Sequence, residues 1–249
     1  MVNFPTHNKK LKDWVNKMAR LCAPDDIVWI DGSDSQRIFL EKEALSRGEI
    51  IQLNPQKLPH CFLHRTAVDD VARTEHLTFI CAKTKRAAGP TNNWMPAQLA
   101  YRKAKAIFKG AMRGRTMYVV PFSMGPVGSS FSKIGVELTD SIYVVLNMLI
   151  MTRSGEAVLR QLEKEDKFTK CLHSKAELDI NKRLILHFPE DNTIWSVGSG
   201  YGGNVLLGKK CLSLRIASYI AKKEGWLAEH MLIMGIEEPN GHIEYIAAA

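Results

Sequence analysis

Residues 198–210 read Gly198-Ser-Gly-Tyr-Gly-Gly-Asn-Val-Leu-Leu-Gly-Lys-Lys210, and they nearly match two nucleotide-binding patterns. From Gly203 onward, the spacing of the glycines and the first lysine is that of a phosphate-binding P-loop. A P-loop continues with Ser or Thr, whose hydroxyl binds Mg²⁺, whereas Lys210 offers only an amine. This segment is therefore not predicted to be a P-loop.

The same stretch contains the dinucleotide-binding spacing G-x-G-x-x-G in Gly198, Gly200 and Gly203, after a strand-like apolar run. A Rossmann fold needs a helix that opens at the third glycine, but here the next helical pattern begins only near Leu212. The Rossmann interpretation is therefore not supported. What the residues do predict is a glycine-rich turn that exposes Tyr201 and lets backbone amides approach an anion, followed by two lysines.

A chain of 249 residues with 45% hydrophobic and 24% charged residues is an ordinary globular composition, with enough length for one large domain or two. The longest apolar run, Ile142 to Met151, includes Asn147 and is far shorter than the ~20 residues that cross a membrane. The N-terminus resembles neither a signal peptide nor a transit sequence. We expect a cytoplasmic location, with a mitochondrial form as the alternative, and no membrane partner.

The cysteines are odd in number and contain no C-x-x-C pair, so they indicate neither a disulfide framework nor a zinc site. We expect them to be reduced and mostly buried. The five are Cys22, Cys61, Cys81, Cys171 and Cys211.

The formal charge of +8 and a pI near 9.2 suit nucleic acid, an acidic membrane surface or small polyanions as partners. In the densest basic stretch, 102–115, the apolar residues Ile107, Phe108 and Met112 have helical spacing, which predicts a surface helix with a solvated basic face. No nucleic-acid-binding signature accompanies it, so nucleic acid is not the expected partner. A non-enzymatic protein that binds small anions or nucleic acid is the alternative from another class.

Apolar periodicity predicts helices and strands in alternation, which is typical of an α/β fold. Helices are predicted at 11–21, 35–47, 96–109, 141–151, 155–164 and 212–223. Strands are predicted at 27–30, 77–81, 117–122, 134–138, 184–188, 194–197, 231–236 and 242–246. The most loop-like segments are 84–96 and 123–132.

Five segments, spread over most of the chain, together resemble GTP-dependent phosphoenolpyruvate carboxykinase and follow the order found in that family. This coincidence is far more specific than either glycine pattern alone. The segments are Val71-Ala-Arg-Thr-Glu75, Gly114-Arg-Thr-Met-Tyr-Val-Val-Pro-Phe-Ser-Met-Gly-Pro126, Lys133-Ile-Gly-Val-Glu-Leu-Thr-Asp140, Gly198-Ser-Gly-Tyr-Gly-Gly-Asn204 and Trp226-Leu-Ala-Glu-His-Met-Leu232.

The resemblance implies a lyase that converts oxaloacetate and GTP into phosphoenolpyruvate, GDP and CO₂ in gluconeogenesis, with Mn²⁺ or Mg²⁺ as cofactor. It implies a mixed-sheet α/β fold, with an N-terminal substrate-binding domain over 1–225 and the first strands of a truncated C-terminal nucleotide-binding domain over 226–249. The GTP-binding P-loop, a further metal-binding aspartate and the lid are expected beyond Ala249, so no nucleotide-binding residue is predicted in this chain. We expect the isolated chain to have no turnover and the full-length protein to be a monomer.

The resemblance assigns substrate-binding and catalytic roles. Arg73 resembles the mobile-loop arginine that contacts the substrate, and Lys209 resembles a neighbouring active-site lysine; both are predicted to be catalytic. Tyr201, Gly202 and Gly203 resemble the site of the substrate carboxylate. Arg73, the amides near Tyr201 and Lys209 would form a cationic cradle for a dicarboxylate or an enol phosphate.

The resemblance also assigns two protein ligands of the catalytic manganese, Lys210 and His230. A lysine that binds a metal must be neutral, which the charge of the cation favours, and neutral imidazole suits Mn²⁺ as well. Decarboxylation leaves an enolate, and a divalent cation beside a lysine stabilises that charge.

Two residues after Arg73 depart from the family pattern, because Thr74 stands where an aliphatic residue is common and Leu77 where a basic one is. We expect them to alter the motion of the loop but not the role of its arginine. A truncated paralogue that has lost catalysis and kept substrate binding is a further alternative.

Overall fold

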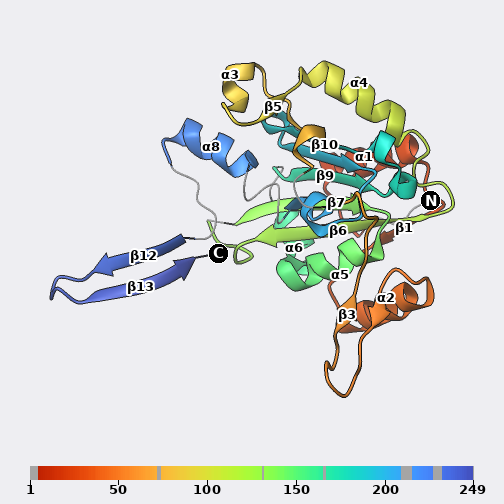
Figure 1. Cartoon of the computed structure of the whole chain (residues 1–249), viewed down its shortest axis with the longest axis horizontal. Helices are drawn as coiled ribbons and strands as arrows, with labels where there is room; N and C mark the ends of the chain where they lie inside the picture. Colours follow the sequence, from red (N-terminus) through yellow and green to blue (C-terminus); the bar gives the residue numbers. More distant parts are fainter. Residues whose placement is uncertain are drawn as a thin grey trace.

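The computed structural model describes residues 5–71, 74–130, 132–164, 167–208, 215–226 and 232–248. Its centre is a nine-stranded mixed sheet with the order β1-β6-β7-β9-β11-β10-β4-β5, in which β8 also pairs with β6 (Figure 1). The strands are β1 (Asp26–Trp29), β4 (Thr78–Ile80), β5 (Asn93–Trp94), β6 (Thr116–Met124), β7 (Lys133–Thr139), β8 (Arg153–Ser154), β9 (Thr169–Ser174), β10 (Leu184–Phe188) and β11 (Thr193–Val197). The mixed α/β fold that the sequence predicts is confirmed.

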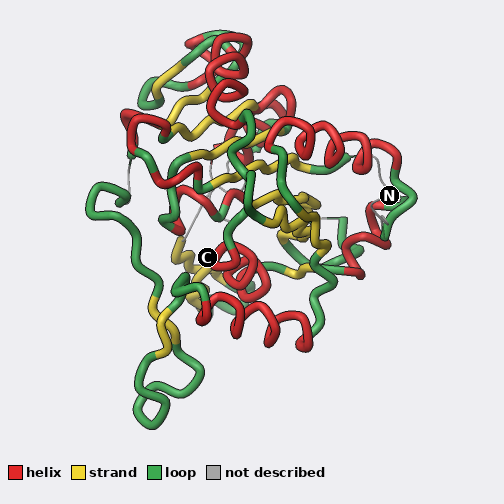
Figure 2. The backbone as a smooth tube through the Cα atoms, turned by 90° about the vertical axis from the view of Figure 1, so that its right-hand side faces the viewer, coloured by secondary structure: helices red, strands yellow, loops and turns green. Residues whose placement is uncertain are grey.

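Helices cover both faces of this sheet, and Figure 2 shows the strands lying between them. The helices are α1 (Lys9–Cys22), α2 (Asp34–Ser46), α3 (Lys85–Ala88), α4 (Ala97–Phe108), α5 (Ile142–Met151), α6 (Glu156–Leu162), α7 (Gly202–Val205) and α8 (Ala217–Glu224). Side-chain caps begin three of the longer ones, because Asn8, Ser33 and Ser141 accept hydrogen bonds from the first turns of α1, α2 and α5. Short 3₁₀ turns lie at Glu75–Leu77, Ala176–Leu178, Ile180–Lys182 and Pro189–Asp191.

Strand β6 shows how the sheet is buried on both faces. Met117 and Val119 belong to one hydrophobic core, whereas Tyr118, Val120 and Phe122 belong to the other, and all five are at most 2% exposed. Successive side chains of a strand point to opposite faces, so β6 separates the two cores. Helices α1, α4 and α6 pack in the first core, and α2 and α5 pack in the second.

Most long predicted elements are confirmed, but one central strand was missed. β9 reads Thr169-Lys-Cys-Leu-His-Ser174, which has too few apolar residues for a strand pattern, yet it lies between β7 and β11. Its buried His173 and Ser174 form hydrogen bonds with Thr139 and Asp140, at the end of the adjacent strand β7, so their burial costs little free energy. The segment 84–96, predicted as a loop, contains α3 and β5, and β6 extends into the second predicted loop as far as Met124.

Two hairpins lie outside the main sheet. β2 (Ile51–Gln52) pairs with β3 (Phe62–Leu63), and β12 (Leu232–Glu237) pairs with β13 (Ile243–Ala248). The β12–β13 hairpin projects away from the body of the molecule (Figure 1). It falls in the part predicted to open a second domain; the domain boundary itself stays a prediction.

The basic stretch and the cysteines behave largely as expected. In α4 the small residues Ala100 and Ala104 are buried while the lysines at 103 and 105 are exposed, as predicted for a surface helix. The helix ends at Phe108, so Met112 and the basic residues after it lie outside it. Cys22, Cys81 and Cys171 are buried, Cys61 is exposed, and Cys211 lies outside the described residues. Within the described ranges, no helix has the length and apolar character required to traverse a bilayer.

Candidate substrate site at the sheet edge

The predicted site residues that the structure describes lie at one edge of the main sheet. β7, β9 and β11 are parallel, so their carboxyl ends meet there, and β10, antiparallel to β11, begins there. Ligands of open α/β sheets commonly bind outside the carboxyl ends of strands. The segment 198–204, named the glycine loop, follows β11 directly at this edge and includes the first three residues of α7. The prediction that no helix begins before Leu212 is therefore wrong, although α7 has only four residues.

Geometry favours glycine at three positions of this loop, Gly198, Gly202 and Gly203. Gly198 has a φ of 77°, which favours glycine. A Cβ on Gly202 would lie 2.8 Å from the hydroxyl oxygen of Tyr143, and one on Gly203 would lie 2.6 Å from Cε1 of the Tyr201 ring. The loop therefore packs against two tyrosines at distances that only glycine allows.

The backbone amides of the glycine loop are already occupied by a carboxylate of the chain. Oδ2 of Asp70 accepts hydrogen bonds from the amides of Gly200 (2.6 Å) and Tyr201 (3.2 Å), and Oδ1 accepts one from Ser199 Oγ (2.6 Å). Asp70 is fully buried. The expectation that the amides near Tyr201 approach an external anion is therefore wrong for these two, because an internal anion satisfies them.

The loop is also joined to the segments on either side of Arg73. Asn204 Nδ2 donates to the carbonyl of Val71 (3.4 Å), and Thr74 Oγ1 donates to Asn204 Oδ1 (3.3 Å). The fully buried Arg183 lies with its Nε 3.7 Å from Asp70 Oδ1 and donates from Nε to the carbonyl of residue 198 (3.0 Å). Thr74, one of the two departures from the family pattern, thus contributes directly to this connection.

An aromatic wall stands beside Tyr201. The His64 ring stacks on Tyr143 with centroids 3.7 Å apart and planes 12° from parallel. His64 Nδ1 lies 2.7 Å from the carbonyl oxygen of Glu49, and Nε2 lies 3.3 Å from that of Gly200. Burial raises the pKa of Tyr143, and the neighbouring Tyr201 raises it further, so its hydroxyl is a neutral hydrogen-bonding group at physiological pH.

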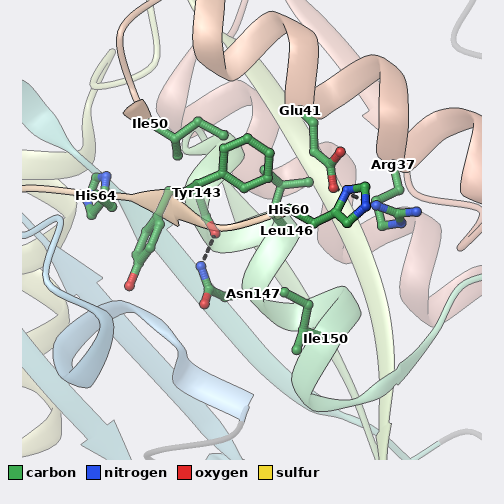
Figure 3. Close-up of a pocket in the computed structure, with 10 residues that line it drawn as sticks. Arg37, Glu41, Ile50, His60, His64, Tyr143, Leu146, Asn147 and Ile150 are labelled. Carbon is green, nitrogen blue, oxygen red and sulfur yellow. Dashed lines mark hydrogen bonds and ion pairs between the residues drawn. The ribbon is translucent and has the colours of Figure 1, made fainter. Parts of the chain in front are cut away.

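Two adjacent cavities share this wall. The glycine-loop cavity, about 310 Å³, is lined by His64, Thr66, Tyr143, Asn147, Met151, Tyr201, Gly202, Gly203 and Leu206. A larger one of about 620 Å³ lies under α2 and is lined by Arg37, Glu41, Ile50, His60, Phe62, His64, Tyr143, Leu146, Asn147 and Ile150 (Figure 3). In the larger cavity the Arg37 guanidinium is paired with Glu41 at 2.5 Å, which leaves less charge for an anion. The glycine-loop cavity is lined by Tyr201, Gly202 and Gly203, the residues predicted to bind the substrate carboxylate, so it is the better candidate for the substrate site.

A buried carboxyl group holds the chain that leads to Lys209. The side chain of Glu137, on β7, is fully buried and accepts from the amides of Leu207 and Gly208, both at 3.4 Å. Burial raises the pKa of Glu137 to about 8, while the two amide hydrogen bonds act in the opposite direction. The segment before Lys209 is therefore hydrogen-bonded to the central sheet through a buried carboxyl group whose pKa is raised by burial.

Four of the predicted site residues lie outside the described residues: Arg73, Lys209, Lys210 and His230. Within the described part of the chain, no three His, Cys, Asp or Glu side chains are grouped to hold a metal ion. Lys210 and His230 would offer two nitrogen donors, and the oxygen ligands that Mn²⁺ and Mg²⁺ commonly take would have to come from other groups, so the metal site stays a prediction.

Sequence reasoning missed Asp70, Arg183 and His64. Asp70 is one of two adjacent aspartates, a pattern that usually belongs to a solvated turn, and its partners are 129 to 131 residues away in sequence. The available signal was its position three residues before Arg73, within the same chain segment.

Two relatives of this chain, from different bacteria, carry the same name. The chain matches the family described as phosphoenolpyruvate carboxykinase N-terminal domain over residues 13–222. It is 58% identical over 245 residues to phosphoenolpyruvate carboxykinase (GTP) of Anaeromyxobacter sp. (strain K), covering 98% of this chain and 41% of the relative. It is 51% identical over 251 residues to the protein of the same name from Chlamydia pneumoniae, covering 96% and 42%.

The mixed sheet, with helices on both faces and a glycine loop and cavity at the carboxyl ends of its strands, defines an α/β domain. The match over 13–222 makes the family specific: the chain belongs to the phosphoenolpyruvate carboxykinase N-terminal domain family. It spans about two fifths of the length of the curated relatives it matches.

Proposed function

We propose that this chain is the substrate-binding part of a GTP-dependent phosphoenolpyruvate carboxykinase, which converts oxaloacetate and GTP into phosphoenolpyruvate, GDP and CO₂. The observation that carries the proposal is the glycine-loop cavity, in which Tyr201, Gly202 and Gly203 line one space of about 310 Å³. That volume suits a small dicarboxylate better than a nucleotide.

Within this proposal, Tyr201, Gly202 and Gly203 receive a carboxylate of oxaloacetate. The hydrogen bonds that join Asn204 to Val71 and to Thr74, on either side of Arg73, support a role for that arginine at the same cavity. A guanidinium binds a carboxylate through two parallel hydrogen bonds, which orients the substrate as well as attracting it.

Lys210 and His230 are proposed to hold Mn²⁺ or Mg²⁺, and Lys209 to lie next to the reacting atoms. A bound divalent cation would stabilise the enolate left by decarboxylation. The attachment of Leu207 and Gly208 to Glu137 supports this assignment, since it gives the following lysines a firm base on β7.

GTP binding is proposed to require the rest of the enzyme, with the division between domains near residue 225. Phosphoryl transfer depends on positioning and on charge neutralisation around the γ-phosphate. The isolated chain is therefore expected to bind substrate analogues without turnover, and a cytoplasmic role in gluconeogenesis is proposed for the whole protein.

Isothermal titration with oxalate and phosphoglycolate tests the proposal. We expect the chain to prefer both over acetate and nitrate, and Tyr201→Ala to weaken oxalate binding by about tenfold, a loss near 1.4 kcal/mol. Tyr245→Ala is the matched control, because that ring is 73% exposed on the β12–β13 hairpin. Equal affinity for all anions, falling steeply with salt, would instead identify a general polyanion-binding protein. GTP-dependent decarboxylation by this chain without the nucleotide-binding half would contradict the expected lack of turnover.

A further inference from the structure

We propose that Asp70 is a positioning residue: its carboxylate is an internal anion that holds the glycine loop in register with the segment around Arg73, and so sets the place of Tyr201. Its effect on substrate binding rests on the function proposed above. Its effect on the loop stands independently, on the contacts of the described residues.

The glycine loop is folded around the carboxylate of Asp70. Two consecutive amides, those of Gly200 and Tyr201, converge on one oxygen of Asp70 at 2.6 and 3.2 Å. Successive amides that point into one concavity form an anion-binding nest, and hydrogen bonds to a charged acceptor are roughly twice as strong as neutral ones. The Ser199 hydroxyl adds a third donor to the other oxygen. The loop therefore has its conformation because an anion fills it.

Arg183 supplies the positive charge opposite the carboxylate of Asp70. Arg183 at the start of β10 is as fully buried as Asp70, and its Nη1 donates to the carbonyl of Asp69 at 2.7 Å. Through Nε the same guanidinium donates to the carbonyl of Gly198. Asp70 and Arg183 therefore each link the segment before Arg73 to the glycine loop. If either segment moved, a buried charge would lose its partner.

The contacts of the glycine loop lie on both sides of Arg73 along the chain. Asp70 precedes Arg73 by three residues, and Asn204 accepts from Thr74 on the far side of that arginine. The loop that carries Tyr201 and the segment that carries Arg73 are therefore joined at 70, 71 and 74 before any ligand arrives. Preorganisation of this kind lowers the entropy lost on binding.

Amide hydrogen exchange, followed by NMR, tests the positioning role without any substrate. In Asp70→Ala the amides of Gly200 and Tyr201 should exchange at least about tenfold faster, since a charge-assisted hydrogen bond is lost. Millimolar formate, which restores a carboxylate to the vacated space, should slow them again, and chloride at equal ionic strength should not. Asp13→Asn is the control, because that side chain is 62% exposed on α1, where it pairs with Lys9; exchange should stay within about twofold of native.

Asp70→Asn guards against a variant that fails to fold. It keeps the volume of the side chain but places an amide group, which cannot accept on its nitrogen, among the donors of Ser199, Gly200, Tyr201 and Asn204. We expect the same two amides to lose protection while those of β6 and β11 keep theirs. Native exchange at Gly200 and Tyr201 in Asp70→Asn, or a folded Asp70→Ala protein that formate does not restore, would overturn the proposal.

Oxalate titration then connects the loop to the substrate. Asp70→Asn should weaken oxalate binding by about tenfold, whereas the control Asp13→Asn should change it by less than about twofold. Native oxalate affinity in Asp70→Asn, together with lost protection of the two amides, would overturn the link to substrate binding. If the native chain bound no oxalate at all, the proposed function would fail, and the exchange result alone would still decide the role of Asp70.

Discussion

The β6 strand and the β12–β13 hairpin are both rich in apolar β-branched and aromatic residues, yet their surroundings are opposite. Val119, Val120 and Phe122 of β6 are fully buried, whereas Ile233 and Tyr245 of the hairpin are 80% and 73% exposed. Local sequence therefore sets the strand conformation in both, and the cover of helices decides whether burial stabilises it. An isolated two-stranded hairpin is marginal in water, so the main sheet should hold nearly all of the folding free energy.

The sharpest way to break this comparison is to remove one ring from each region. Phe122→Ala should lower the free energy of unfolding by about 3–5 kcal/mol, because it removes a fully buried ring and leaves a cavity. Tyr245→Ala should change it by no more than about 0.5 kcal/mol, since its ring already faces water. Urea denaturation followed by circular dichroism measures both. Similar losses in the two variants would show that the hairpin and the sheet share one cooperative core.

A smaller effect is expected from adding a methyl group to a glycine in each region. A Cβ on Gly135 of β7 would overlap the Phe122 ring, so Gly135→Ala should cost about 1–3 kcal/mol. In Gly235→Ala the new Cβ would lie 3.2 Å from Cε1 of Tyr245, an exposed ring that can move away. That variant should be nearly neutral in thermal unfolding monitored by circular dichroism. Equal destabilisation by both would contradict the expected difference in packing.

The smallest expected effect, per pH unit, comes from a histidine in each region. Burial, together with the nearby Arg215, lowers the pKa of His187 on β10 from 6.5 to about 3. Below pH 6.5 this histidine is protonated in the unfolded state but stays neutral in the native state. It therefore makes the free energy of unfolding decrease as the pH is lowered, by roughly 1 kcal/mol between pH 6 and pH 5. His187→Gln should remove that component from urea unfolding curves, and His242→Gln on the hairpin should leave it. An unchanged pH dependence in His187→Gln would refute the assignment.

How much of the fold the sequence could predict depended on where the polar residues lay. β6, β7, β10 and β11 carry enough Val, Ile, Leu and Phe to be recognised as strands. β9 could not be recognised, because its polar side chains are buried only through partners contributed by other segments, such as Thr139 for His173 and Asp140 for Ser174. A local pattern carries no record of such partners.

The candidate site divides in the same way. The glycine loop was visible in the sequence, since glycine spacing reflects backbone geometry, and the resemblance then supplied roles for Tyr201 and its neighbours. Asp70 and Arg183 were not visible, because their importance comes from contacts made across more than a hundred residues. The expectation about free amides failed for this reason: the anion that fills the nest is a side chain of the same protein.

The ring of Phe122 lies between β7 and the segment that leads to Lys209. The ring of Phe122 occupies the space where a Cβ would stand on Gly135 and also where one would stand on Gly208. An aromatic residue at 122 and the two glycines therefore form a unit whose members can change only together. In related sequences a smaller residue at the position of Phe122 should be accompanied by a larger one at either glycine, and an exchange at a single position should be rare.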